Sequence, residues 1–379
     1  MENKGGKDQT GNTDLIPYQT SSKASEAKKN HERRQGVLYL GVDLGTSKTS
    51  IVSSNGIRES KFSTVGYPKD VVSIKFLKQE VMFGEDAIKN RLSLNLYRPL
   101  RNGVIKGSDG NDSYSENEIR MNLNAARDLV KFAISLAMPR TDELIYGVVG
   151  CPAQASIKNK NYLVEVAKEA LDSVVICSQP FAVAYGMDWF SNLMVIDIGA
   201  DTVDLCCINS SLPGEEDQIV LKTAGDYVDK ELARLISQSY PEAQFSDNMI
   251  KNIKERHATV AKNTPPIKVE FPVQGKLREF DITREMKQAC RSIIPQIIDA
   301  LSKLTAPFDP EFQMCLKENV LLCGGSSQIH GMKEAIEKNM KESLGHGRIV
   351  IVEEPMYAGA NGALKIAHDI PPDFWYQLK

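Results

Sequence analysis

The sequence predicts an α/β protein of two related domains, and three observations carry this prediction. An apolar strand that ends in Asp-x-Gly and leads into a second strand occurs twice, with Asp43 and Asp197 lying 154 positions apart (197 minus 43). Such a wide spacing indicates a duplicated domain and not a solenoid of short repeats. Each copy is followed by segments with apolar residues at helical steps. The 379 residues, 42% of them hydrophobic, are enough for about two sizeable cores.

The first hairpin begins the part of the chain that we expect to be ordered. Val37–Asp43 is a strand-like apolar run, and Thr49–Val52 is a second β-branched run, with glycine and small hydroxyl residues between them. Residues 1–35 are rich in Lys, Ser, Asn, Gln and Gly, so we expect a disordered tail. The tail lacks the apolar face of a membrane-anchoring helix, and no apolar run is long enough to span a bilayer, so we expect no direct membrane insertion.

The segments after each hairpin predict the remainder of the two domains. Apolar residues recur at helical spacing in Glu116–Met138, Asn161–Leu171 and Asp281–Leu304. The turn-rich stretch Gly107–Asn117 predicts a surface loop, and alternating apolar residues in Asn263–Val273 predict an edge strand. We place domain I at residues 36–190 with a small subdomain at about 66–116, and domain II at residues 191–379 with a small subdomain at about 226–280.

A third apolar strand carries a separate signal near the end of the chain. Asn319–Cys323 runs into the turn Gly324-Gly325-Ser326-Ser327, and the amphipathic segment Gln328–Leu344 follows. A strand, a glycine turn and a helix N-terminus in this order suit a phosphate group or a nucleotide, because helix N-termini present free backbone N–H groups to anions.

The tips of the two hairpins have the composition of an anion site. Glycine at a tip lets backbone amides approach an anion closely, because no Cβ intervenes. Small hydroxyl residues at both tips add donors. A carboxylate beside a polyphosphate is repulsive unless a divalent cation lies between them, so we expect Asp43 and Asp197 to hold the waters of a Mg²⁺. Two opposed tips gripping one phosphate chain would explain why the pattern is duplicated.

The composition excludes several other classes of function. A formal net charge of -3 gives no electrostatic footprint for nucleic acid. The seven cysteines include no C-x-x-C pair and most sit among apolar neighbours, which indicates reduced core residues in a cytoplasmic protein. The five histidines are scattered and show no metal-ligand spacing.

Taken together, these motifs resemble the superfamily of actin, the heat-shock chaperone ATPases and the sugar kinases. Asp43–Thr49 resembles its first phosphate motif, Asp197–Asp204 its second, and Val320–Gly331 its adenosine motif. Ser178–Gly186 and Tyr357–Leu364 are similar to its two hinge helices, where small residues allow a close crossing. The resemblance implies an actin-like fold: two domains, each with a mixed sheet flanked by helices, and a cleft that binds ATP and Mg²⁺.

Family-specific strings narrow the resemblance to the MamK family, the bacterial actins that organise magnetosome chains. They are Val65–Asp70, Gly84–Ala87, Pro213–Gln218 and Pro371–Leu378. This resemblance implies an ATPase that polymerises with itself into cytoplasmic filaments along the magnetosome chain. It also implies magnetosome-associated proteins as partners.

The superfamily resemblance assigns roles to the candidate site residues. Gly45, Thr46 and Ser47 would hold the β- and γ-phosphates. Opposite them would lie Gly199 and Thr202, and the adenosine pocket would be lined by Gly324, Gly325 and Ser326. Lys254 and Glu255 fall on a segment like the actin helix that binds ribose and base; the alternative for this pair is an exposed salt-bridge face.

Two departures from the superfamily pattern bear on hydrolysis. Gln179 falls at the position of the side chain that orients the attacking water in the superfamily, where bacterial members often have glutamate. Glutamine cannot accept a proton, so we expect slow hydrolysis, with Asp197 sharing the task of orienting the water. Asp201 stands where the second loop normally has glycine. The sequence leaves three possibilities open: the Asp201 side chain points outward, it helps to hold the metal, or it lowers nucleotide affinity. Lys48 near the first tip contacts phosphate or points into solvent.

Other functions on the same fold remain alternatives at this point. A chaperone would need a substrate domain after its ATPase half, and the sequence ends at Lys379 without one. A small-molecule kinase would need a dedicated catalytic aspartate, and nothing in the sequence supports one. A plasmid-segregating or cell-shape actin is the remaining alternative, although the amphipathic tail of the shape-determining type is missing.

Overall fold

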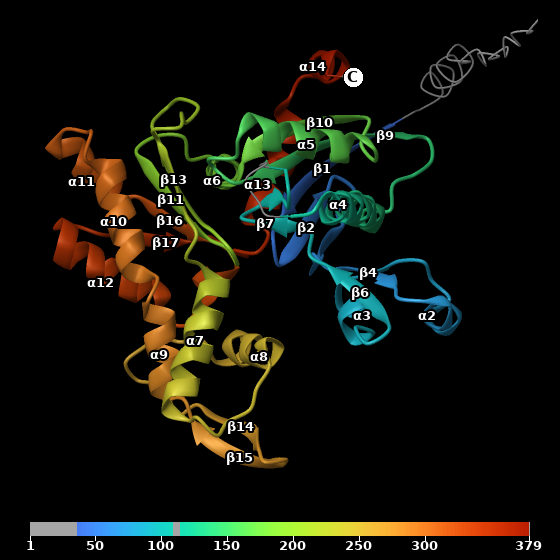
Figure 1. Cartoon of the computed structure of the whole chain (residues 1–379). Helices are drawn as coiled ribbons and strands as arrows, with labels where there is room; N and C mark the ends of the chain where they lie inside the picture. Colours follow the sequence, from blue (N-terminus) through green and yellow to red (C-terminus); the bar gives the residue numbers. More distant parts are fainter. Residues whose placement is uncertain (1–35, 109–113, 379) are drawn as a thin grey trace, which may run out of the picture.

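The computed structural model describes residues 36–108 and 114–378, which form two lobes (Figure 1). The predicted tail, residues 1–35, lies outside the described residues, and so does the centre of the predicted loop at 107–117. Among the described helices, none combines the length and the apolar character that a membrane crossing requires.

Domain I is built on a five-stranded mixed sheet. Its strands are β1 (Gly36–Leu44), β2 (Lys48–Ser53), β3 (Arg58–Phe62), β9 (Glu143–Cys151) and β10 (Ser173–Ser178). They lie in the order β10-β9-β1-β2-β3. The β1–β2 and β2–β3 pairs are antiparallel, whereas β1–β9 and β9–β10 are parallel.

Domain II repeats this sheet strand for strand. Its strands are β11 (Leu193–Ile198), β12 (Val203–Ile208), β13 (Gln218–Leu221), β16 (Val320–Cys323) and β17 (Ile349–Ile351). The order β13-β12-β11-β16-β17 has the same sequence of two antiparallel and two parallel pairs. The duplication inferred from the two Asp-x-Gly patterns is therefore present as two copies of one topology, with β1 equivalent to β11 and β2 equivalent to β12.

Helices flank both sheets. They are α4 (Glu116–Leu136), α5 (Ile157–Lys168), α6 (Gln179–Gly186), α7 (Gly225–Ser239), α8 (Asp247–His257), α9 (Thr283–Arg291), α10 (Ile294–Thr305), α11 (Pro310–Glu318), α12 (Met332–Leu344), α13 (Ala358–Asp369) and α14 (Pro372–Gln377). The start of α4 is fixed by a capping box in which the Ser115 hydroxyl accepts from the Glu118 N–H and the Glu118 carboxylate accepts from the Ser115 N–H.

The predicted helices differ from the structure in their bounds. The helix predicted at Asn161–Leu171 is α5, which runs from Ile157 to Lys168 because the Ser156 hydroxyl caps its start, and α4 ends at Leu136 and not at Met138. The segment Asp281–Leu304 forms two helices, α9 and α10, because Pro295 lacks an N–H and its ring clashes with the preceding turn. The helix predicted from Gln328 begins only at Met332. A 3₁₀ turn at Gly325–Gln328 and Gly331, with φ of 81°, come before it.

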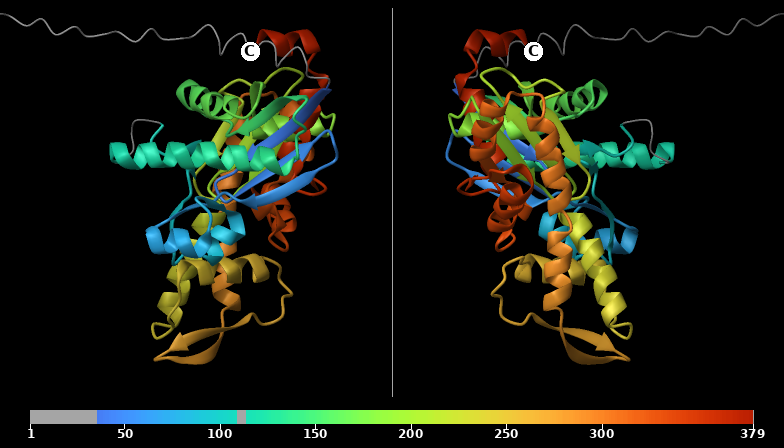
Figure 2. Two further views of the ribbon diagram at one scale, coloured as in Figure 1. Left: turned by 90° about the vertical axis from the view of Figure 1, so that its right-hand side faces the viewer. Right: turned by 90° about the vertical axis from the view of Figure 1, so that its left-hand side faces the viewer.

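Each domain carries a small subdomain. In domain I, β4 (Val65–Pro68), β5 (Met82–Phe83) and β6 (Leu94–Tyr97) form a sheet with α2 (Val71–Leu77) and α3 (Gly84–Lys89); β7 (Leu100–Arg101) and β8 (Val104–Ile105) follow. In domain II, β14 (Lys268–Val273) pairs with β15 (Lys276–Asp281). The predicted edge strand starts at Lys268 and not at Asn263, because Pro265 and Pro266 offer no N–H to a ladder. Figure 2 shows the β14–β15 hairpin at the end of the molecule opposite α14.

The helices α6 and α13 cross between the two sheets (Figure 1). A Cβ on Gly362 of α13 would lie 1.7 Å from the Ala182 carbonyl oxygen of α6, and one on Gly186 would lie 3.0 Å from the Gly362 Cα. The two backbones therefore meet directly. The close helix crossing that the small residues predicted is present, and it joins the domains at the base of the cleft.

Candidate functional site

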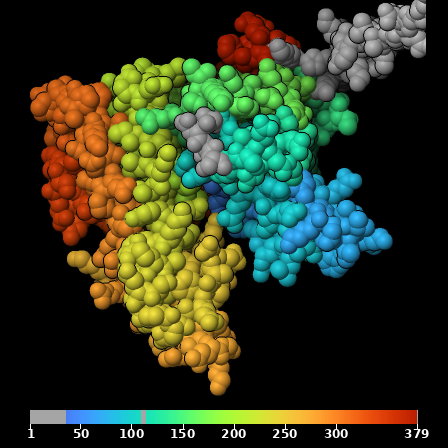
Figure 3. Space-filling view, viewed as in Figure 1, coloured from blue at the N-terminus to red at the C-terminus, as the bar shows by residue number. Residues whose placement is uncertain are grey.

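One cavity of about 590 Å³ lies between the domains, and both hairpin tips line it. Figure 3 shows the surface hollowed between the two lobes. We call Gly45–Lys48 the first tip and Gly199–Thr202 the second tip. All the predicted site residues line this cavity: Asp43, Gly45, Thr46, Ser47, Gln179, Asp197, Gly199, Asp201, Thr202, Lys254, Glu255, Gly324, Gly325 and Ser326. The structure thus brings together every residue that the sequence singled out; the role of each stays a prediction.

The two tips are built alike. Asp43 pairs with Ser50 across the first hairpin, and Asp197 pairs with Asp204 across the second. A Cβ on Gly45 would lie 2.5 Å from the Lys48 carbonyl oxygen, and a Cβ on Gly199 would lie 3.1 Å from the Thr202 carbonyl oxygen. Glycine is needed at both turns because the chain folds back on itself at these points.

Three carboxyl groups gather beside the cavity, and sequence analysis had given a role to only two of them. Burial and the neighbouring Asp204 raise the pKa of Asp43 to about 6, although a hydrogen bond from Gln179 opposes the shift. Burial, Asp43 and Asp204 raise the pKa of Asp197 well above its usual range. Burial also raises the pKa of Asp204, whose Oδ1 accepts from the Ala153 N–H at 2.8 Å. The site therefore holds more negative charge than its own residues compensate.

Asp204 could have been found in the sequence. If Gly199 and Thr202 close the hairpin, the register places residue 204 directly opposite residue 197, on the same face of the sheet. Position 50 lies opposite Asp43 by the same rule, and there the residue is a serine whose hydroxyl donates to the Met356 carbonyl. The second hairpin thus contributes two carboxylates where the first contributes one.

The carboxylate cluster fits a hydrated divalent cation. Among residues 36–108 and 114–378, no group of three or more His, Cys, Asp or Glu side chains converges with the geometry of direct metal ligands. A cation of the Mg²⁺ type keeps several of its waters and binds phosphate oxygens. Asp43, Asp197 and Asp204 suit such an ion, because each can accept a hydrogen bond from a coordinated water and the positive charge would offset their mutual repulsion.

Gln179 is the first residue of α6 and points at Asp43. Its Nε2 donates to Asp43 Oδ1, which fixes the orientation of the amide and leaves the carbonyl oxygen as its remaining acceptor. The Gln179 side chain lies against Gly150, where an added Cβ would be 3.0 Å from its Cγ. A glycine in β9 therefore makes room for the side chain predicted to orient water.

Asp201 makes a contact that the sequence did not foresee. Its Oδ2 accepts a hydrogen bond from the backbone N–H of Asn102, in the turn between β7 and β8 of domain I. Close by, the Gly103 N–H donates to Thr46 Oγ1 at 3.3 Å. The Asp201 carboxylate is therefore held at the backbone of Asn102. It joins the second tip to the opposite domain.

Lys254 and Glu255 occupy different environments. Lys254 is buried, and its Nζ donates to Asp229 Oδ2 and to the Gly225 carbonyl, both at 2.8 Å, so it ties α8 to the start of α7. The exposed salt-bridge face considered for this pair is therefore wrong for Lys254. Glu255 is exposed at the cavity wall. Its assignment to ribose stays a prediction.

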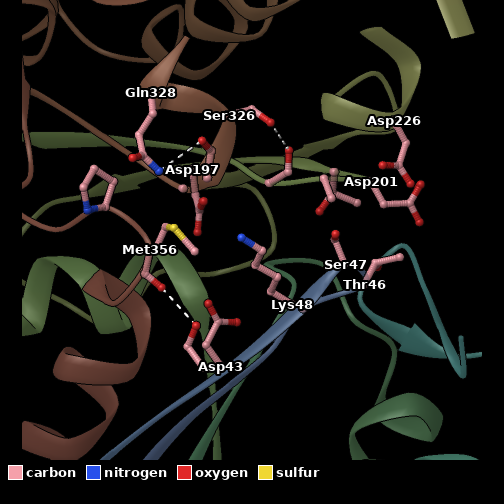
Figure 4. A pocket seen from close by; sticks show the side chains of 18 of the residues that line it. Asp43, Thr46, Ser47, Lys48, Asp197, Asp201, Asp226, Ser326, Gln328 and Met356 are labelled. Atoms are coloured by element: carbon pink, nitrogen blue, oxygen red, sulfur yellow. Dashed lines mark hydrogen bonds between the residues drawn. The ribbon is translucent and has the colours of Figure 1, made fainter. Parts of the chain in front are cut away.

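The third glycine turn packs directly on the second tip (Figure 4). Ser326 Oγ donates to the Gly199 carbonyl at 2.9 Å. Gly324 has a φ of 85°, and a Cβ there would lie 2.2 Å from Asp197 Oδ1. Glycine at position 324 is thus required by both its backbone conformation and its contact with the carboxylate. In the same view Lys48 points into the cavity.

Replacing Asp204 by asparagine should stabilise the nucleotide-free protein. Asparagine keeps an oxygen for the Ala153 N–H but removes one of three mutually repelling buried charges. Because one pKa unit corresponds to about 1.4 kcal/mol, we expect a gain of about 1 kcal/mol in the free energy of unfolding at pH 7, measured by urea denaturation.

The pH dependence follows from the same charges. The pKa of Asp43 in the folded protein, about 6, exceeds its usual 3.8, so the folded state binds more protons than the unfolded state between these values. Wild-type stability should fall as the pH rises through this window, and less so in Asp204→Asn. The control is Asp299→Asn, because Asp299 forms an exposed ion pair with Lys303. This substitution should leave the free energy of unfolding and its pH dependence unchanged. A less stable Asp204→Asn protein would show that the cluster does not repel.

Comparisons with known proteins agree with this geometry. A family model described as MreB/Mbl protein matches residues 38–372. The chain is 34% identical over 365 residues to the actin-like protein MamK of Magnetospirillum gryphiswaldense, covering 96% of this chain and 98% of that protein. A solved MamK double helical filament matches with a TM-score of 0.83 and 35% identity, covering 89% of this chain and 100% of that one. A non-polymerising MamK mutant bound to AMPPNP matches with a TM-score of 0.67 and 35% identity, covering 88% and 100%.

Proposed function

Because the chain belongs to the MreB/Mbl protein family, we propose that it is a bacterial actin-like cytoskeletal protein that binds ATP between its domains and polymerises into filaments. The actin-like fold and the similarity to MamK that the sequence predicted are both confirmed. The observation that carries the proposal is the pair of matched hairpin tips facing one another across a single cavity.

In the proposed complex the two tips bind the phosphates from opposite sides. The backbones of Gly45 and Gly199 lie close to the phosphates from opposite sides, and the hydroxyls of Thr46 and Ser47 donate to them, with Thr202 facing them from the second tip. The turn that contains Gly324, Gly325 and Ser326 lines the adenosine end, where Lys254 and Glu255 also lie. The bound AMPPNP of the MamK structure supports a nucleotide of this size in the cleft.

The proposal also includes hydrolysis of the bound ATP. A bound Mg²⁺ would neutralise phosphate charge in the transition state. The residues of the chain then have to place one water in line with the γ-phosphate. Gln179 is fixed by its bond to Asp43, so its carbonyl oxygen accepts from that water. Burial and the charges of Asp43 and Asp204 raise the pKa of Asp197, which suits its carboxylate to accept a proton.

Polymerisation by head-to-tail addition needs complementary surfaces at the two ends of the subunit, because a contact that does not close into a ring produces a filament. Apolar side chains are exposed in both small subdomains: Val72 is 76% and Phe76 is 71% exposed on α2, and Leu277 is 64% exposed on β15. Ile157, at the start of α5, is 79% exposed. These exposed groups support burial against a second copy of the chain.

The cellular role is proposed on the similarity to MamK alone. The filament would lie in the cytoplasm as part of the cytoskeleton and would organise or position magnetosomes. Magnetosome-associated proteins would then be its further partners. If the protein were found away from magnetosomes in the host cell, this localisation would favour a plasmid-segregating role.

Purified protein should sediment as filaments with ATP and Mg²⁺ at micromolar concentration and remain monomeric without nucleotide, with electron microscopy confirming the filaments. The double variant Val72→Glu/Phe76→Glu should raise the critical concentration at least about 10-fold, because desolvating a charge in an apolar contact costs more than about 1.4 kcal/mol. Its ATP affinity should be unchanged.

Lys75→Glu is the matched control for this variant. Lys75 is exposed on the same helix, and the substitution changes the net charge by the same amount without removing apolar surface. It should polymerise nearly as well as the wild type. Wild-type protein that stays monomeric with ATP and Mg²⁺ would contradict the filament proposal.

A further inference from the structure

Lys251, on α8 of domain II, reaches across the cleft to the first tip. Its Nζ donates to Ser47 Oγ of domain I at 2.8 Å. Sequence analysis gave this lysine no role, because nothing in the pattern of α8 shows that the helix docks against the opposite domain. It lines the cavity together with Ser47 and Lys48.

The surroundings of Lys251 compensate its charge only in part. Among the described residues no ion pair joins it to a carboxylate, and its closest ring is Phe62, with Nζ 5.9 Å from the ring centroid. Lys48 Nζ lies 5.2 Å from the centroid of the same ring. Burial lowers the pKa of Lys251. The charge of Asp226 is the largest contribution that opposes this shift, Glu255 also opposes it, and Arg98 and Lys254 add to it. Two ammonium groups, one from each domain, thus flank one aromatic ring in the cleft.

We propose that Lys251 is a phosphate-contacting residue that binds the terminal phosphate of a nucleoside triphosphate and so holds domain II against the first tip. The inference rests on the proposed function, since it assumes a nucleotide in this cavity. It adds a residue from the opposite domain to a phosphate site that the tips alone would otherwise form.

The position of Lys251 identifies which phosphate it contacts. Figure 4 shows Gln328, of the turn assigned to adenosine, on one side of the cavity and Thr46 and Ser47 on the other. An anion that accepts from Ser47 Oγ therefore lies at the phosphate end of the nucleotide, where the first tip is proposed to hold the β- and γ-phosphates. Such an oxygen would lie within about one further hydrogen-bond length of Lys251 Nζ, so the ammonium exchanges a neutral hydroxyl for a charged acceptor.

The hydrogen bond of Asp201 to the opposite domain limits how far the two lobes have to move when Lys251 binds a phosphate. The Asn102 N–H already holds the second tip against domain I, so the two lobes meet on that side of the cleft. Lys251 then needs to shift only between Ser47 Oγ and a phosphate oxygen bound beside it. The contact would be present with a triphosphate and weaker or missing with a diphosphate.

The test compares ATP and ADP affinities, each with Mg²⁺, by isothermal titration calorimetry on the full chain carrying Val72→Glu/Phe76→Glu to suppress assembly. Lys251→Gln should weaken ATP binding by about 10-fold and ADP binding by less than about 3-fold, because a charge-assisted bond to the terminal phosphate is lost. Lys251→Arg should recover most of the ATP affinity. Lys230→Gln, which removes an exposed charge from α7 away from the cavity, should bind both nucleotides normally.

The ratio of the two affinities separates a phosphate contact from a structural role. Equal weakening of ATP and ADP, or no weakening of either, would overturn the inference while leaving the proposed function intact. A parent protein that binds neither nucleotide would contradict the proposed function itself. Circular dichroism of each variant checks that the fold is retained.

Discussion

Replacing Asp197 by asparagine is expected to slow phosphate release from ATP by about 100-fold or more while ATP still binds. Asparagine preserves the shape of the side chain beside Gly324 but cannot accept a proton, and general-base contributions in enzymes are about 10²–10⁴-fold. Filaments of Asp197→Asn assembled with ATP should therefore persist, because hydrolysis no longer weakens them. Phosphate release and light scattering, recorded on the same samples, measure both effects.

Two comparisons sharpen this prediction. Gln179→Ala removes the amide that fixes Asp43 but leaves the Asp197 carboxylate, so hydrolysis should fall less than in Asp197→Asn. Asp299→Asn, on the exposed face of α10, should hydrolyse ATP at the wild-type rate. Wild-type phosphate release from Asp197→Asn would show that the carboxylate is not needed and would move the role to Asp43 or Asp204.

The parts of the fold that the sequence predicted are those set by local patterns. The apolar strands, the glycines at their tips and the repeat of Asp43 at Asp197 are short-range signals, and the repeat of a hairpin predicts the repeat of its sheet. Helix ends were less accurate. The break before Pro295 could have been read from the proline, whereas the late start of α12 depends on Gly331 adopting a left-handed conformation against Ala261.

The parts that sequence analysis missed depend on contacts between the domains. Lys251 meets Ser47, and Asp201 meets Asn102, only because the two lobes dock in one particular orientation. No periodicity along the chain encodes that orientation. Asp204 is different, since hairpin register alone places it opposite Asp197. The repelling carboxylates are a cost to folding that only a bound cation and nucleotide would offset, as is common at functional sites.

The helix crossing connects fold stability to the site, and Gly362→Ala tests the connection. A methyl group at position 362 would overlap the Ala182 carbonyl oxygen, so α6 and α13 have to move apart. Overpacking of this kind costs about 3 kcal/mol. The displacement also reaches the site, because α6 begins with Gln179 and α13 carries Gly359, where an added Cβ would lie 3.4 Å from Asp43 Oδ2. We expect a lower melting temperature together with slower hydrolysis.

Gly325→Ala provides the matched glycine-to-alanine control. A Cβ at position 325 meets no atom within 4 Å, so the melting temperature should match that of the wild type, and any effect should be confined to nucleotide affinity. Thermal unfolding without nucleotide, followed by phosphate release at a temperature where both variants are folded, separates the two cases. A Gly362→Ala protein with wild-type stability would mean that the hinge yields freely at the crossing. Domain closure would then have to be controlled at the cleft, by Asp201 and Lys251, and not at its base.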